Sequence, residues 1–169
     1  MNKVNIYLVP FSLLIGGSIA TAQMLSSYVS TDPAANGFTP SENGSAPPIY
    51  YDQEEYKPIV TAVNDLQRDI MAVSVFRPDV KACSNAFPPS NKEIIIVGTI
   101  GKNKLIDQLI QEGRIVVEGL KGCWETFSIQ MIKQPFTGIE KALVIAGSDL
   151  RGTLYGIYDI SKNIGVSPW

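Results

Sequence analysis

The hydrophobic period changes in the middle of the segment 142–164, and this change most restricts the folds open to the chain. Residues 142–146 form a short apolar run, which is typical of a strand that is covered on both faces. After the turn residues 147–149, apolar side chains recur every three or four positions. This spacing predicts an amphipathic helix that ends at Gly165 and the nearby Pro168. A buried strand followed by such a helix indicates a fold that mixes strands and helices.

The same alternation of strand and helix patterns extends over the region 49–165. The first helix is expected to begin between Asp52 and Pro58, where Glu54 and Glu55 suit its positively polarised end. We predict an α/β or α+β domain with a mixed sheet of about five strands and about three helices. The last two strands are expected to pair as a hairpin. The predicted strands lie at 49–51, 80–82, 94–97, 124–132 and 142–146, and the helices span 59–73, 105–110 and 154–164.

Residues 1–22 have the pattern of an export signal. Lys3 precedes a mostly apolar run, and the small residues Ala20 and Ala22 define a cleavage site, so the mature chain is expected to begin at Gln23. The alternative is an uncleaved membrane anchor. Pro10 interrupts the run, which is also shorter than a membrane-spanning helix requires. We expect a secreted protein, extracellular or periplasmic, without a membrane association after cleavage.

The region 23–48 is predicted to be a flexible linker, because it is rich in Ser, Thr, Pro, Gly and Asn and has few large aliphatic residues. Within it, Asn43 begins an Asn-Gly-Ser sequence that matches the acceptor pattern for N-glycosylation. The alternative is that this tripeptide occurs by chance.

Composition excludes several classes of function. The chain contains no histidine, which removes catalytic triads, a histidine base and His-ligated zinc. The net charge is −2 and the basic residues are scattered, so the sequence lacks the basic patch that is typical of proteins that bind nucleic acid. The turn 98–102 precedes a helix, but it lacks the spacing of a phosphate-binding loop. We therefore expect no metal and no cofactor. With 169 residues, the chain is also too short for a (β/α)8 barrel of roughly 250 residues.

Three stretches of the sequence resemble one known family. They are Ile-Ile-Ile-Val-Gly-Thr-Ile-Gly-Lys-Asn-Lys-Leu-Ile-Asp (94–107), Gly-Cys-Trp-Glu-Thr-Phe-Ser-Ile-Gln (122–130) and Val-Ile-Ala-Gly-Ser-Asp-Leu-Arg-Gly-Thr-Leu-Tyr-Gly-Ile-Tyr-Asp (144–159). A further match follows in Ile-Gly-Val-Ser-Pro-Trp (164–169). Together they resemble the N-terminal domain of glycoside hydrolase family 115, the xylan α-1,2-glucuronidases, over roughly 49–169.

The resemblance implies a mixed sheet with helices on one face, like the small domain before the barrel in hexosaminidase-type glycosidases. It also implies that residues 166–169 begin the connection to a catalytic barrel, which is missing from this chain. The catalytic acids of the family come from that barrel, so none is assigned here. We expect the chain to be the non-catalytic domain of an enzyme that releases glucuronic or 4-O-methylglucuronic acid from glucuronoxylan. Whether the chain itself is an enzyme stays open, and a fragment without the barrel is expected to be inactive.

The loop after the last predicted strand contains the candidate site residues Ser148, Asp149 and Arg151. Backbone amides at a helix N-terminus and a guanidinium favour a carboxylate such as glucuronate. The alternative is structural: Ser148 or Asp149 caps the helix, and Arg151 pairs with an acid on this domain or on the barrel. Our hypothesis places Arg151 at a domain interface or at the rim of the active-site cleft.

Cys83 and Cys123 suit a disulfide in an exported protein. A bridge between them would close a loop of 41 residues and stabilise the fold by about 4 kcal/mol. The alternative is two buried thiols.

A second function class is a free-standing secreted carbohydrate-binding or interaction module. Four aromatic residues are its candidates for stacking on sugars, although core packing is the better default explanation of their positions in predicted strands or a helix. They are Tyr50, Tyr51, Trp124 and Tyr155.

Overall fold

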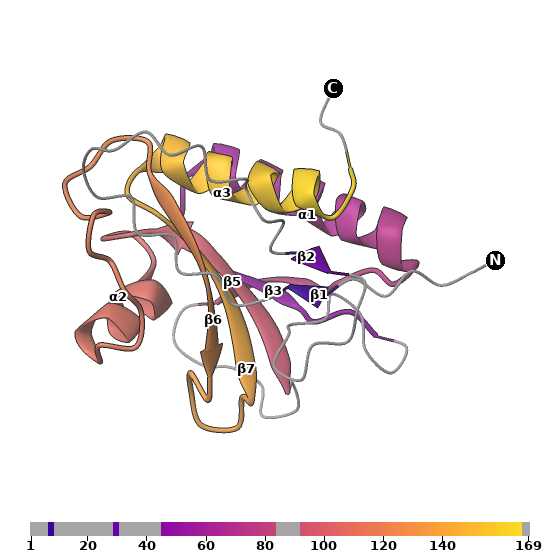
Figure 1. Cartoon of the computed structure of the whole chain (residues 1–169), viewed down its shortest axis with the longest axis horizontal. Coiled ribbons are helices and arrows are strands. Elements are labelled where there is room, and N and C mark those ends of the chain that lie inside the picture. The colour runs from indigo at the N-terminus through magenta and orange to yellow at the C-terminus, as the bar shows by residue number, and fades with distance from the viewer. Residues whose placement is uncertain (1–6, 9–28, 31–44, 84–91, 167–169) are drawn as a thin grey trace.

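The computed structural model describes residues 7–8, 29–30, 45–83 and 92–166 (Figure 1). Its centre is a five-stranded sheet in the order β4-β3-β5-β7-β6. All neighbours are parallel except β6 and β7, which pair antiparallel as the expected hairpin. The strands are β3 (Ile49–Asp52), β4 (Val80–Cys83), β5 (Glu93–Thr99), β6 (Phe127–Lys133) and β7 (Lys141–Gly147). The prediction of a mixed five-stranded sheet is confirmed.

Three helices cover the sheet, as predicted, but they lie on both of its faces (Figure 1). They are α1 (Lys57–Ser74), α2 (Lys104–Gln111) and α3 (Leu150–Asn163). Helices α1 and α3 pack side by side on one face, and α2 packs on the other. The expectation of helices on one face is therefore wrong. The continuous apolar runs of β5 and β7 explain the difference, because such strands must be covered on both sides.

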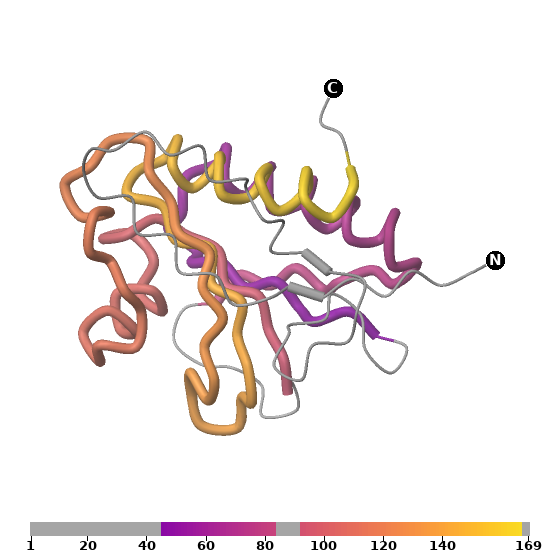
Figure 2. The backbone as a smooth tube through the Cα atoms, in the orientation of Figure 1, coloured from indigo at the N-terminus to yellow at the C-terminus, as the bar shows by residue number. Residues whose placement is uncertain are grey.

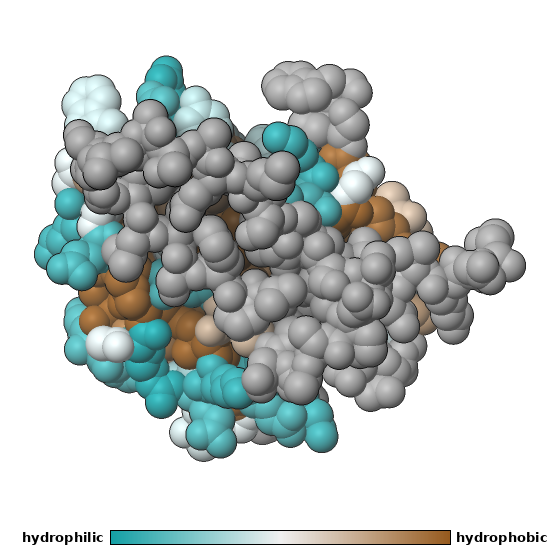
Figure 3. All heavy atoms as spheres, viewed as in Figure 1, coloured by the Kyte–Doolittle hydropathy of each residue, from teal (hydrophilic) through white to brown (hydrophobic). Residues whose placement is uncertain are grey.

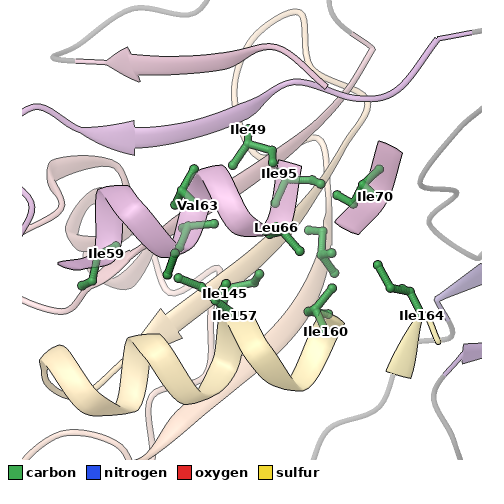
Figure 4. Packing of buried hydrophobic residues seen from close by; sticks show 13 residues of the cluster. Ile49, Ile59, Val63, Leu66, Ile70, Ile95, Ile145, Ile157, Ile160 and Ile164 are labelled. Atoms are coloured by element: carbon green, nitrogen blue, oxygen red, sulfur yellow. The ribbon is translucent and has the colours of Figure 1, made fainter. Parts of the chain in front are cut away.

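Alternate residues of the two central strands face the two helix layers. Ile95 and Ile145 belong to the cluster under α1 and α3, whereas Ile96 and Val144 belong to the cluster under α2. Figure 4 shows the first of these clusters from close by. Its labelled side chains come from the sheet (Ile49, Ile95, Ile145), from α1 (Ile59, Val63, Leu66, Ile70) and from α3 and the residue after it (Ile157, Ile160, Ile164).

Helix α1 begins within the expected range and has Pro58 in its first turn, where no amide hydrogen bond is lost. Its N-cap is Tyr56, which makes no side-chain capping bond. The helix ends at Val75, whose φ of 69° is in the left-handed region. This conformation turns the chain back toward β4 at the sheet edge, as the tube in Figure 2 shows.

A second, two-stranded sheet that the sequence did not predict pairs β1 (Tyr7–Leu8) with β2 (Val29–Ser30). The rest of the predicted signal peptide, most of the linker with Asn43, and residues 167–169 lie outside the described residues. Among the helices that the structure describes, none is both long and apolar enough to cross a membrane.

Candidate functional site

The candidate loop lies where three parallel strands end. The carboxyl ends of the neighbouring strands β3, β5 and β7 lie side by side. The last residues of these strands are Asp52, Thr99 and Gly147. Ser148 and Asp149 follow β7 directly at this end of the sheet. In open α/β sheets, ligands bind outside the carboxyl ends of the strands, so this end is the natural place to test the predicted site.

Asp149 caps helix α3 and also holds the loop before β6. One carboxylate oxygen accepts a hydrogen bond from the amide of Gly152 at 2.8 Å, and the other accepts one from the amide of Glu125, also at 2.8 Å. The bond from Glu125, followed by that from Gly152, lowers the pKa of Asp149 below its ordinary value. Asp149 thus carries out the capping role that the sequence offered as the structural alternative.

Ser148 ties the same two segments together. Its hydroxyl accepts a hydrogen bond from the amide of Thr126 at 3.1 Å, and its own amide donates to the carbonyl of Thr126 at 2.9 Å. Gly152 approaches this segment so closely that an added Cβ would lie 2.1 Å from the Thr126 carbonyl oxygen. The loop after β7 and the loop before β6 are therefore locked against each other.

Arg151 pairs with an acid on this domain, which is one of its two expected partners. Its guanidinium donates to a carboxylate oxygen of Glu125 at 2.6 Å, and this bond raises the pKa of Arg151 above its ordinary value. The other oxygen of Glu125 accepts a long hydrogen bond of 3.5 Å from the hydroxyl of Tyr155. The Arg151 side chain remains 68% exposed, so the pair lies at the surface. Sequence reasoning did not identify Glu125 as the acid that binds both Arg151 and Tyr155.

Glu55 lies beside the start of α1 at the same end of the sheet, and its carboxylate binds two backbone amides. Its side chain is nearly buried, and its two oxygens accept hydrogen bonds from the amides of Thr99 at 2.9 Å and Tyr56 at 3.2 Å. Glu55 stands directly before the N-cap Tyr56, at the start of α1 where the sequence placed it. Its role depends on Thr99, which is 44 residues away in the sequence and gave no local signal.

The amides at the start of α2 are occupied by the chain itself. The side-chain oxygen of Asn103 accepts hydrogen bonds from the backbone amides of Leu105 and Ile106 at 3.0 and 3.2 Å, and its side-chain NH2 group donates to the carbonyl of Val97. Asp107 accepts from the amide of Gly101. These internal bonds leave no open phosphate cradle in the turn 98–102, in agreement with the structural reading of that turn.

Two threonine hydroxyls join the ends of β5 and α3. The hydroxyl oxygens of Thr99 and Thr153 are 2.9 Å apart, and both residues are buried. Thr153 also donates toward the carbonyl of Asp149 at 3.0 Å. Thr99 and Thr153 thus bind each other at this end of the sheet, whereas the nearby buried hydroxyl of Thr126 has no hydrogen-bond partner among the described residues.

The aromatic candidates divide into two pairs. Tyr50 is 2% exposed and Tyr51 is half-buried, so both are part of the core. Trp124 is 86% exposed and Tyr155 is 48% exposed. Trp124 precedes Glu125 in the chain, and the hydroxyl of Tyr155 donates a hydrogen bond to the Glu125 carboxylate.

Cys83 and Cys123 are thiols, and no disulfide joins them. Cys83 is buried at the end of β4, whereas Cys123 is exposed in the loop before β6. The predicted disulfide is therefore wrong. Strands β4 and β6 lie at opposite edges of the sheet, four strand spacings or roughly 19 Å apart, and a disulfide needs Cα atoms within about 7 Å.

Within the described part of the chain, no three Cys, Asp or Glu side chains converge in a way that could hold a metal ion. An open hollow of about 690 Å³ lies near the amino end of β7, between the end of α2 and the turn 134–140. Glu112, Arg114 and Phe136 are among its lining residues. The hollow therefore does not coincide with the predicted site residues. Figure 3 shows polar and apolar side chains interspersed over the visible surface of the described residues.

Comparisons with known proteins connect this architecture to glycoside hydrolases. No family model matches the chain, and no curated protein matches it. A solved structure does: a family GH115 4-O-methyl-α-glucuronidase, BtGH115A, with specificity for decorated arabinogalactans, is similar at 34% sequence identity with a TM-score of 0.53. The match covers 74% of this chain and 14% of that enzyme.

The described fold is therefore a domain related to a glycoside hydrolase. More particularly, it is a GH115-related domain, which confirms the resemblance found in the sequence. The chain corresponds to only 14% of the length of the related enzyme.

Proposed function

We propose that this chain is the non-catalytic N-terminal domain of a secreted α-glucuronidase-like glycoside hydrolase. In this proposal a catalytic barrel follows residues 166–169. The complete enzyme removes glucuronic or 4-O-methylglucuronic acid from glucuronoxylan or from a decorated arabinogalactan. The observation that carries the proposal is the 34% identity to the GH115 enzyme over 74% of this chain.

The contacts of the carboxylates support a non-catalytic role. Glycoside hydrolysis requires two carboxyl groups that face each other across the sugar, about 5 to 9.5 Å apart according to the stereochemistry. At the carboxyl edge of the sheet, Asp52, Glu55 and Asp149 each accept hydrogen bonds from backbone amides. Glu125 is held by Arg151. Through these contacts the four groups stabilise loops and helix ends.

Assays on two polysaccharides test the proposal. The purified chain is expected to release no glucuronic or 4-O-methylglucuronic acid from glucuronoxylan or arabinogalactan, while BtGH115A on decorated arabinogalactan serves as the active control. Release by this chain alone would refute the non-catalytic role. Sequencing the gene beyond codon 169 is the second test, because the proposal requires an open frame that encodes a barrel. For secretion, N-terminal sequencing of the exported protein should begin at Gln23.

The second candidate function is a free-standing secreted carbohydrate-binding or interaction module. The exposure of Trp124 and Tyr155 favours it, whereas the burial of Tyr50 removes one of its candidate residues. A genuine stop codon directly after codon 169, together with saccharide binding by the chain, would select this function over the first.

A further inference from the structure

We propose that Trp124, Glu125, Arg151 and Tyr155 form a surface subsite for a neutral pyranose unit of a polysaccharide. We call these four residues the aromatic platform. The platform lies where the loop before β6 meets the first turns of α3. The inference rests on the proposed function only for its choice of a saccharide as the ligand class.

The two aromatic side chains of the platform are unusually exposed. Trp124 has 86% of its surface in water and Tyr155 has 48%. Large aromatic residues of folded domains are on average well buried. An aromatic ring at the surface can stack on the apolar C–H face of a pyranose while its polar edge remains hydrated.

The backbone beside Trp124 is held in a strained conformation. Glu125 has a φ of 55°, in the left-handed region that residues with a side chain rarely adopt. Its amide is fixed by Asp149 at 2.8 Å, and the next amide, that of Thr126, is fixed by Ser148 at 3.1 Å. Such strain persists only where surrounding contacts determine it, and it gathers at binding sites. The supports therefore hold the backbone next to Trp124 in place before any ligand arrives.

The charged pair gives the platform polar groups for sugar hydroxyls. Glu125 and Arg151 are joined at 2.6 Å, and the hydroxyl of Tyr155 reaches the second oxygen of Glu125 at 3.5 Å. A carboxylate accepts and a guanidinium donates, so neighbouring hydroxyls of one sugar can bind both. Because Glu125 already compensates the charge of Arg151, the carboxylate of a uronate would gain little electrostatic binding energy at the platform. The ligand favoured by this charge balance is a neutral pyranose rather than glucuronate.

The small size of the platform favours a saccharide over a protein partner. A stable protein interface takes about 800 Å² and about 20 residues from each partner. The residues that lead into Trp124 are the exposed Lys121, Gly122 and Cys123, which add no further large apolar side chain. A pyranose ring, in contrast, is comparable in size to one or two aromatic rings.

Binding of defined oligosaccharides to the purified chain tests the proposal. The probes are galacto-oligosaccharides and xylo-oligosaccharides of four to six units, titrated by calorimetry and by chemical-shift changes of tryptophan indole N–H groups. We expect weak binding of at least one neutral oligosaccharide, with the Trp124 indole shifted. Trp124→Ala should weaken it about tenfold, as expected for a central contact residue. Trp124→Phe should restore part of the affinity, and Arg151→Ala should weaken binding less than Trp124→Ala.

Met71→Ala is the matched control, because Met71 is a 47% exposed apolar residue on α1, outside the platform. It should leave binding unchanged, and thermal unfolding should show that all variants fold. No binding at millimolar oligosaccharide, or equal binding by Trp124→Ala, would overturn the proposal. Absence of binding together with burial of Trp124 in a longer chain that carries a catalytic domain would also overturn it and assign the surface to domain docking. Release of uronic acid is measured separately, so failure here is distinguishable from failure of the proposed function.

Discussion

The amide of Glu125 donates a hydrogen bond of 2.8 Å to the carboxylate of Asp149, 24 residues later in the chain. The same carboxylate caps α3 through Gly152. One side chain thereby fixes both the start of a helix and the strained turn that leads into β6. The candidate site loop thus holds β6 and α3 together, as its structural alternative predicted.

Replacement of Asp149 should reveal this double role. Asp149→Ala removes both hydrogen bonds and should lower the free energy of unfolding by about 1 to 2 kcal/mol. Asp149→Asn should cost less, because its single carbonyl oxygen can retain the bond to Gly152. Chemical denaturation measures both, and the same stability for wild type and Asp149→Ala would contradict the capping role.

The lowered pKa of Asp149 predicts how this stability depends on pH. Because the pKa in the folded state lies below the unfolded value of about 3.9, the contribution is fully present above that value. It is lost as the pH falls through the folded pKa. The difference in unfolding free energy between wild type and Asp149→Asn should therefore shrink below about pH 4. A difference that grows on acidification would refute this assignment.

Gly152→Ala should destabilise the fold although alanine is the better helix former. The added methyl group would meet the Thr126 carbonyl oxygen at 2.1 Å, so the loop before β6 must move. We expect a loss of about 1 to 3 kcal/mol, as for other overpacked sites, seen as a lower Tm. Lys162→Ala on the exposed side of α3 is the control and should change the Tm little.

The hydroxyl pair of Thr99 and Thr153 should show energetic coupling. Thr153→Val leaves the buried hydroxyl of Thr99 without this partner and should cost about 1 to 3 kcal/mol. Thr99→Val should cost less, because the Thr153 hydroxyl keeps its hydrogen bond to the carbonyl of Asp149. The double change removes both polar groups, so its cost should be smaller than the sum. Strict additivity in urea denaturation would show that the two hydroxyls do not interact.

Glu55→Ala should expose the long-range role of this carboxylate. The buried amide of Thr99 then loses its acceptor, and stability should fall by about 1 to 3 kcal/mol. Hydrogen exchange at the Thr99 amide should accelerate. Glu54→Ala is the neighbouring control, since its side chain is 75% exposed. Equal effects of the two changes would contradict the specific bond to Thr99.

The thiols should differ in reactivity. Iodoacetamide is expected to modify Cys123 in the folded protein, because its side chain is exposed, and Cys83 only after unfolding. Peptide mass spectrometry distinguishes the two sites. A folded protein that resists alkylation and is two mass units lighter would instead contain the disulfide.

The elements of the fold follow from the sequence because their signals are local. The apolar run that forms β7 and the three-to-four spacing that forms α3 can each be recognised within one short segment of the sequence. Asp149 was likewise identifiable as a possible cap from its place before a helical pattern. For the same reason, the hairpin of β6 and β7 was predictable, since the two strands are close in sequence.

The sequence by itself thus determined the strands and helices of the region 49–165, although not the short strands β1 and β2. Only the tertiary structure decided which elements meet. The strand order separates Cys83 from Cys123 and excludes their disulfide, while it brings Glu55 to Thr99 and Glu125 to Asp149. Periodicity is set by a residue's near neighbours, whereas strand order results from packing the whole core. Contacts between distant loops depend on that packing, and they leave no pattern in the sequence around either partner.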